Sequence, residues 1–153
     1  MDPAGVPSAA TAFRPVVLGL APGSPDEAVI AFAFEEARRR DTELHVLQGW
    51  NQSPYSVYTM GSGFEPHEEF ARERAAVLTE ALRAWRQKYP DVEVVEVSRP
   101  AGAAGLLIDA SRDASLVVVG RRVRRNPFGA HIGAVTHAVL HHATSPVAVV
   151  AHD

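Results

Sequence analysis

Short hydrophobic runs recur along the chain and alternate with longer amphipathic stretches. Four of these runs, at 14–20, 43–49, 116–119 and 147–151, predict strands of a sheet. A fifth segment, 92–97, alternates valine with glutamate and predicts a strand nearer the edge of that sheet.

Apolar residues at helical spacing lie between the predicted strands. The predicted helices span about 24–40, 66–89, 100–114 and 132–143. Ser24 is expected to cap the first helix in a capping box, with Pro25 at the first helical position. Residues 121–131 are expected to form a loop. Residues 50–64 form another, whose aromatic side chains either cover the strand ends or pack onto the second helix.

The alternation of strands and helices predicts the fold class. It favours an α/β, Rossmann-like domain: one open, mainly parallel five-stranded sheet with helices on both faces. In such sheets a ligand binds beyond the carboxyl ends of the strands, where the strand order changes direction. The loops after Leu20 and Val119 are therefore the expected site. Residues 13–153 are predicted to form this single domain, and residues 1–12 a flexible tail.

Composition excludes several kinds of chemistry. The chain has no cysteine, which excludes disulfides, thiolate metal sites and cysteine nucleophiles. Its net charge of −3 gives no general attraction to nucleic acid or to a membrane, so both are disfavoured as partners. No apolar stretch approaches the roughly 20 residues needed to cross a bilayer, and the first residues do not form a signal peptide. A cytoplasmic location is the default expectation.

Two segments resemble parts of the universal stress protein family. PVVLGLAPGSPDEA (15–28) is similar to the family's first strand and helix, and VVVGRRVRRNPFGAHIGAVTHAVLHHATSPVAVV (117–150) is similar to its C-terminal signature. The resemblance implies a non-enzymatic role in stress response or signalling, a homodimer, and a site for adenine nucleotide with Mg. It implies no catalytic residue. In the members that bind ATP, a G-x-x-G-(nine residues)-G-[S/T] loop follows the fourth strand and binds the phosphates through backbone N–H groups.

This chain departs from the ATP-binding pattern. Gly120 and Gly133 match the first and third glycines, but Val123 stands at the second, where a side chain is strained or obstructs the phosphates. Ala134 replaces the Ser or Thr, which removes a hydrogen bond to a charged group worth about 1.5–3 kcal/mol. Ala21 replaces the acidic residue that the family places at the end of the first strand. The resemblance therefore implies weak or altered binding of ATP.

Four arginines lie within the loop that departs from the ATP-binding pattern: Arg121, Arg122, Arg124 and Arg125. They either bind phosphate or another anion through bidentate guanidinium contacts, or they form solvated surface charge. A slow ATP-hydrolysing switch and a module for a polyanion or an unknown protein partner remain as alternatives. The predicted nucleotide or anion site comprises Leu20, Ala21, Leu47, Gly120, Arg121, Arg122, Val123, Arg124, Arg125, Gly133, Ala134 and Val135.

Histidines are concentrated near the C-terminus. His137 and His141 are four residues apart on a predicted helix, a spacing that can bind a metal ion. The HExxH carboxylate is absent and no third ligand is evident, so the favoured interpretation is a polar helix face and no metal site is predicted.

The last strand predicts an assembly surface. Residues 146–151 are apolar throughout, and in the family's strand order this segment lies at the sheet edge, where Pro146 is tolerated. An edge with unpaired backbone groups favours pairing with a second copy about a two-fold axis. The predicted dimer interface comprises Val147, Ala148, Val149 and Val150.

Overall fold

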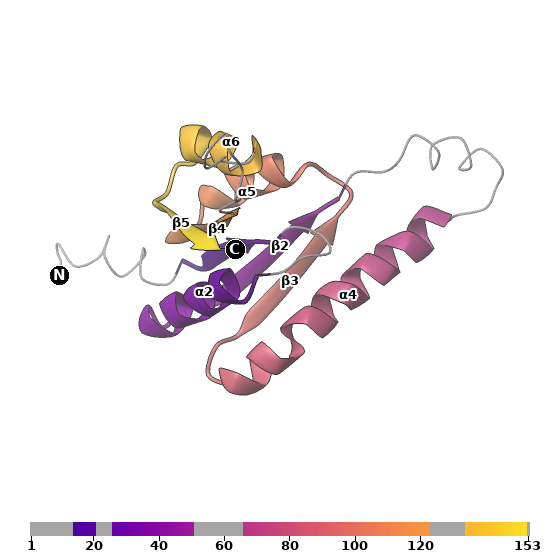
Figure 1. Cartoon of the computed structure of the whole chain (residues 1–153), viewed down its shortest axis with the longest axis horizontal. Helices are drawn as coiled ribbons and strands as arrows, with labels where there is room; N and C mark the ends of the chain where they lie inside the picture. Colours follow the sequence, from indigo (N-terminus) through magenta and orange to yellow (C-terminus); the bar gives the residue numbers. More distant parts are fainter. Residues whose placement is uncertain (1–13, 21–25, 51–65, 123–133, 153) are drawn as a thin grey trace.

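The computed structural model describes residues 14–20, 26–50, 66–122 and 134–152 (Figure 1). The elements in chain order are β1 (Val16–Gly19), α2 (Glu27–Arg39), β2 (Leu44–Gly49), α4 (Pro66–Lys88), β3 (Val94–Arg99), α5 (Ala103–Ser111), β4 (Leu116–Arg122), α6 (Ala134–His142) and β5 (Val147–His152). This order of strands and helices is the one that the hydrophobic pattern predicts.

The strands form one sheet in the order β3-β2-β1-β4-β5, and each neighbouring pair is parallel. β1 lies at the centre, where Val16 is level with Leu44 of β2 and with Leu116 of β4. The prediction of an open, five-stranded parallel sheet is confirmed. β3 and β5 lie at the two edges, also as predicted.

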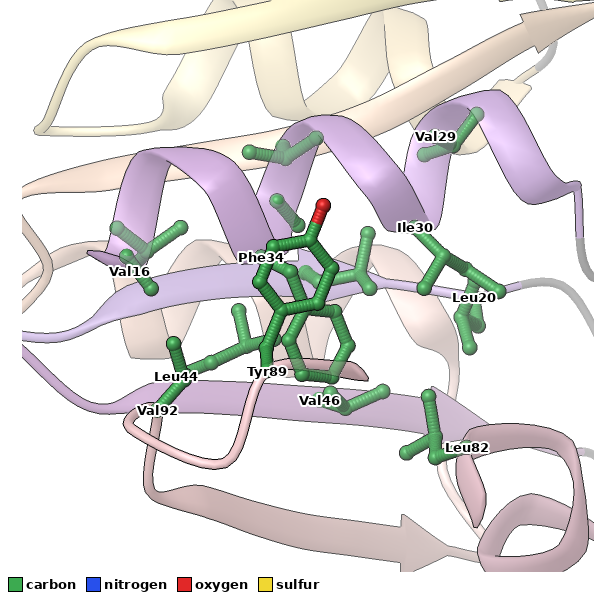
Figure 2. Close-up of a cluster of buried hydrophobic side chains, with 14 of the residues drawn as sticks. Val16, Leu20, Val29, Ile30, Phe34, Leu44, Val46, Leu82, Tyr89 and Val92 are labelled. Carbon is green, nitrogen blue, oxygen red and sulfur yellow. The ribbon is translucent and has the colours of Figure 1, made fainter. Parts of the chain in front are cut away.

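Helices cover both faces of the sheet (Figure 1). On one face, side chains of α2 and α4 pack against alternate residues of the strands and form the larger hydrophobic cluster (Figure 2). On the other face, Leu107 of α5 and Val139 of α6 pack with Val17, Val117 and Val119. The central strands β1, β2 and β4 are therefore buried from both sides, which explains their mostly apolar sequence.

Aromatic rings join α2 to the C-terminal end of α4. The Phe34 ring stacks on Tyr89 with 5.3 Å between the ring centroids, and on Trp85 with 6.1 Å. Phe34 is completely buried, and Tyr89 lies beside it in the same cluster (Figure 2). These contacts attach α4 to the rest of the layer at one end of the helix.

The first helix begins later than the sequence predicts. Its N-cap is Asp26, which has an extended backbone and whose Oδ1 accepts hydrogen bonds from the backbone N–H groups of Ala28 (2.8 Å) and Val29 (3.4 Å). The prediction of a capping box with Pro25 at the first helical position is therefore wrong. Ser24 and Pro25 themselves lie outside the described residues. Asp26 is nearer to the helix in the sequence than Ser24, and its carboxylate accepts hydrogen bonds from backbone N–H groups that have no partner within the helix.

The fourth strand is longer than its apolar run. It continues to Arg122, because β5 pairs with it through Arg121 opposite Ala151 and Arg122 opposite His152. The prediction that a loop begins at residue 121 is therefore wrong for these two arginines. Backbone pairing does not depend on apolar side chains, so the hydrophobic pattern ended the strand too early.

Candidate functional site

The carboxyl ends of β1 and β4 meet at the point where the strand order changes direction. Leu18 of β1 is level with Val118 of β4, and Leu20 and Gly120 follow two residues further along. Leu20 also donates a backbone hydrogen bond to the carbonyl of Leu47 (3.0 Å). The structure therefore brings together three of the predicted site residues, Leu20, Leu47 and Gly120, at the end of the sheet where parallel α/β folds bind ligands.

Several other predicted site residues cannot be compared with the structure. The described residues do not include Ala21, Val123, Arg124, Arg125 and Gly133. The described part of α6 starts at Ala134, followed by Val135, and both side chains are exposed.

Gly120 is enclosed by three elements. A Cβ atom at this position would lie 2.9 Å from Nε2 of His152 and 3.0 Å from Cγ2 of Val29. The carbonyl oxygen of Gly120 accepts a 3.0 Å hydrogen bond from the hydroxyl of Thr136, a buried residue of α6. The first glycine of the signature therefore has a packing role in this chain, because a side chain here would displace His152 of β5 and Val29 of α2.

A histidine–carboxylate contact that the sequence did not suggest lies beside Gly120. Nδ1 of His152, at the end of β5, lies 3.1 Å from Oδ2 of Asp26, the N-cap of α2. The side chains are only 14% and 25% exposed, respectively. No local spacing relates the two residues. The signal that could have found the pair is the parallel register of β5, which carries His152 to the carboxyl edge of the sheet.

The side chain of Arg121 has a buried hydrogen-bond donor, Nε, for which the described residues supply no acceptor. Val117 and Val119 of the same strand lie in the cluster with α5 and α6, and the alternation of a strand places Arg121 on that face too. An anion at the carboxyl end of β4 would supply an acceptor to such a guanidinium.

The histidines of α6 lie on its exposed surface. The rings of His137 and His141 have centroids 4.4 Å apart, and both side chains are exposed. Among the residues that the structure describes, no group of three or more His, Asp or Glu side chains is arranged to bind a metal ion. Within the same part of the chain, no helix combines the length and apolar composition needed to cross a bilayer.

Solved structures with this fold include nucleotide complexes. The universal stress protein UspA of Lactobacillus plantarum matches with a TM-score of 0.64 at 18% identity, over 90% of this chain and 97% of that one. The universal stress protein of Archaeoglobus fulgidus in complex with dAMP matches with a TM-score of 0.57 at 23% identity, over 90% and 97%. A universal stress protein in complex with cAMP has a TM-score of 0.58 at 17% identity, over 92% and 98%.

Sequence comparisons extend over most of the chain. A universal stress protein of Mycolicibacterium smegmatis is 36% identical over 89% of this chain and 45% of its own length. Universal stress protein Rv2005c of Mycobacterium tuberculosis is 38% identical over 88% of this chain and 44% of its own length. The chain thus spans less than half the length of these relatives. The model of the Universal stress protein family matches residues 12–151, and the chain therefore belongs to that family.

Proposed function

We propose that this chain is a cytoplasmic, non-enzymatic stress-response protein that forms a homodimer and binds adenine nucleotide weakly. The observation that supports the nucleotide site most directly is the position of Gly120. This residue lies near the carboxyl ends of β1 and β4, where the strand order changes direction, and packs against α2 and β5. Two proteins of this fold are described as complexes with dAMP and with cAMP. Weak binding is proposed because Ala21, Val123 and Ala134 each lack a feature of the ATP-binding pattern.

The outer edge of β5 supports the proposed dimer. In a single chain, Val147 to Val150 are all half-buried, although they contact the clusters on both faces of the sheet. The carbonyl of Pro146 accepts from the Val117 N–H, so the alternation of the strand directs the N–H groups of Val147 and Val149 towards the outer edge. A second copy of β5 could pair with these groups and cover the apolar side chains.

The opposite edge is less suited to pairing. Arg86 of α4 donates a hydrogen bond to the Val94 carbonyl of β3 (3.4 Å) and forms an ion pair with Glu96 of the same strand. Glu96 also accepts a 2.6 Å hydrogen bond from the Thr79 hydroxyl. Charged side chains on an edge strand oppose the approach of another strand. β5, which ends its apolar run without such a group, is the edge on which we place the second copy.

The length of the relatives is consistent with a paired unit. This chain covers 45% of the Mycolicibacterium smegmatis protein and 44% of Rv2005c. More than half of each relative lies outside the match, which is enough for a second unit of this size. We infer that a unit of this fold functions beside another one, supplied here by a second copy of the chain.

Titration calorimetry with Mg-ATP tests the nucleotide proposal. The dissociation constant should be no smaller than about 100 μM, which corresponds to roughly −5.5 kcal/mol. The double variant Val123→Gly with Ala134→Ser restores two features of the pattern and should bind at least about tenfold more tightly. Ala76→Ser, an exposed change on α4, is the matched control and should leave the affinity unchanged. A low-micromolar constant for the wild type would contradict weak binding.

A second candidate function is the binding of an inorganic or organic anion by the arginines. The observation that favours it is the buried Nε atom of Arg121, which lacks a partner in the described part of the chain. Sulfate or phosphate at low ionic strength should then raise the melting temperature, and replacing Arg124 and Arg125 with alanine should abolish that rise. Replacing Arg72 and Arg83, exposed on α4, removes the same charge elsewhere and should not. An unchanged rise in the first double variant would mean that Arg124 and Arg125 form solvated surface charge.

A further inference from the structure

We propose that His152 is a positioning residue that links the assembly edge of the sheet to the first turn of α2. The Asp26–His152 pair would then couple pairing along β5 to one wall of the candidate nucleotide site. The coupling to the site rests on the function proposed above. The link between His152 and the first turn of α2 stands on the geometry alone.

The pair joins two elements that are distant in sequence. His152 is the last residue of β5, and its Nδ1 lies 3.1 Å from Oδ2 of Asp26. Both side chains are largely shielded from water, at 14% and 25% exposure. A polar contact in such surroundings is electrostatically stronger than one on the surface.

Asp26 uses its second oxygen for a different purpose. Oδ1 accepts hydrogen bonds from the N–H groups of Ala28 and Val29, which lie in the first turn of α2. One carboxylate therefore both starts the helix and binds His152. Any displacement of His152 is transmitted through this carboxylate to α2, the helix that follows β1. The start of α2 therefore links His152 to the carboxyl ends of β1 and β4.

The absence of a side chain at Gly120 leaves room for the imidazole ring of His152. Nε2 of His152 lies 2.9 Å from where a Cβ atom of residue 120 would be, so the ring fits only because that side chain is absent. On its carbonyl side, Gly120 accepts the hydrogen bond from Thr136 of α6. The first glycine of the signature is therefore in contact with the end of β5 and with α6, the helix that follows the predicted phosphate loop.

Pairing with a second copy would act on the same strand. The alternation of β5 directs the backbone groups of Val147, Val149 and Ala151 towards the outer edge, and Ala151 immediately precedes His152. A strand bound on both sides moves less than one bound on a single side. The dimer should therefore hold His152, and through it the first turn of α2, more firmly than the monomer does. By linkage, a ligand that orders this turn should favour the dimer to the same extent.

Amide hydrogen exchange tests the link, because Ala28 and Val29 report directly on Asp26. In His152→Ala, exchange of these two amides should accelerate about fivefold, the effect expected from losing one hydrogen bond of ordinary strength. His152→Asn keeps an N–H donor at the place of Nδ1 and should restore most of the protection. His142→Ala removes an exposed histidine of α6 and should have no effect.

The same variants test the coupling to assembly. In the wild type, exchange at Ala28 and Val29 should slow as rising protein concentration converts monomer to dimer, and this dependence should disappear in His152→Ala. Unchanged exchange in His152→Ala would overturn the link itself. Altered exchange with an undiminished concentration dependence would overturn the coupling. A wild type that stays monomeric at every concentration would refute the proposed dimer and the coupling together, while the exchange rates would still decide the link.

Discussion

At the scale of single residues, the Glu35 carboxylate illustrates how one contact sets a charge state. The hydroxyl of Tyr89 donates a 2.6 Å hydrogen bond to Oε2 of Glu35, and Arg38 donates to Oε1 at 2.9 Å. The hydrogen bond from Tyr89, assisted by the positive charges of Arg38 and Lys88, holds the pKa of Glu35 below its ordinary value of 4.5 despite some desolvation. The same hydrogen bond raises the pKa of Tyr89.

A lowered pKa in the folded protein predicts a pH-dependent contribution to stability. It is fully present above the unfolded value of 4.5 and is lost as the pH falls through the lower folded value. Tyr89→Phe keeps the stacked ring but removes the hydroxyl. It should therefore destabilise the protein more at pH 7 than at pH 3, as measured by urea unfolding at both values. Equal destabilisation at the two pH values would contradict this assignment.

Gly120 predicts a second effect at this scale. Gly120→Ala should lower the free energy of unfolding by about 1–3 kcal/mol, because the new Cβ would crowd His152 and Val29. Gly105→Ala is the matched control, since a Cβ at this helical position would meet nothing within 4 Å and should stabilise α5 by about 0.5–1 kcal/mol. Chemical denaturation measures both changes. If Gly120→Ala were as stable as the wild type, the packing role of this glycine would be wrong.

The sequence identified some of the residues that matter at the candidate site and missed others. Gly120 was identified because it matches a motif with fixed spacing, and the structure adds a packing reason for it. The Asp26–His152 pair escaped prediction because the two residues are at opposite ends of the chain and meet only through the sheet register. Contacts of this kind depend on tertiary structure, which no local pattern encodes.

At the scale of elements, the buried side of a helix contains the positions that matter for stability, and the exposed side contains positions where substitution has little effect. In α4, the side chains of Leu78 and Leu82 are buried against the sheet, whereas Val77 is 52% exposed. Most of the N-terminal half of this helix is exposed, so its attachment depends on the apolar residues of its second half.

Leu82→Ala should therefore lower the free energy of unfolding by about 2–5 kcal/mol, the range for removing a large side chain from a packed core. Val77→Ala shortens an aliphatic side chain on the same helix and should change stability by less than about 0.5 kcal/mol. Denaturant titration of both variants measures the difference. Similar losses in the two would mean that α4 does not pack through the Leu82 face.

Element identities were predictable, whereas element ends were not. Apolar runs identified β1, β2, β4 and β5, and the alternation of valine with glutamate identified β3. The ends depend on partners: β4 extends to Arg122 where β5 pairs with it, and α2 starts at Glu27 where the Asp26 carboxylate caps it. β3 is displaced by two residues from its predicted bounds, since its pairing with β2 begins only at Val94.

At the scale of the whole molecule, the two edges of the sheet differ in character. The β3 edge faces α4 residues that donate hydrogen bonds to it, whereas β5 presents an apolar strand. The parallel sheet was predictable from right-handed crossovers, and the edge position of β5 from the family resemblance. The identity of a partner at the β5 edge follows from neither, because one chain contains only half of such an interface.

Variants of β5 test the assembly surface. Val147→Pro removes an outward N–H without breaking the ladder to β4. Val149→Lys places a charge in the pairing seam or in the core beside it. Both should shift the proposed dimer towards monomer by at least about tenfold in dissociation constant, as measured by sedimentation. Val95→Lys places the same charge on β3, where the side chain is 36% exposed, and should leave the dimer intact. If both β5 variants fold and dimerise like the wild type, β5 is not the interface.

One native mass spectrum of the purified protein tests the proposed function most directly, because it reports assembly and retained ligand together. We predict a species at twice the chain mass of 16.5 kDa with no nucleotide attached, since a site this weak releases its ligand during purification. A monomer at micromolar concentration would contradict the dimer. A dimer that retains one adenine nucleotide per chain would contradict the weakness of the site.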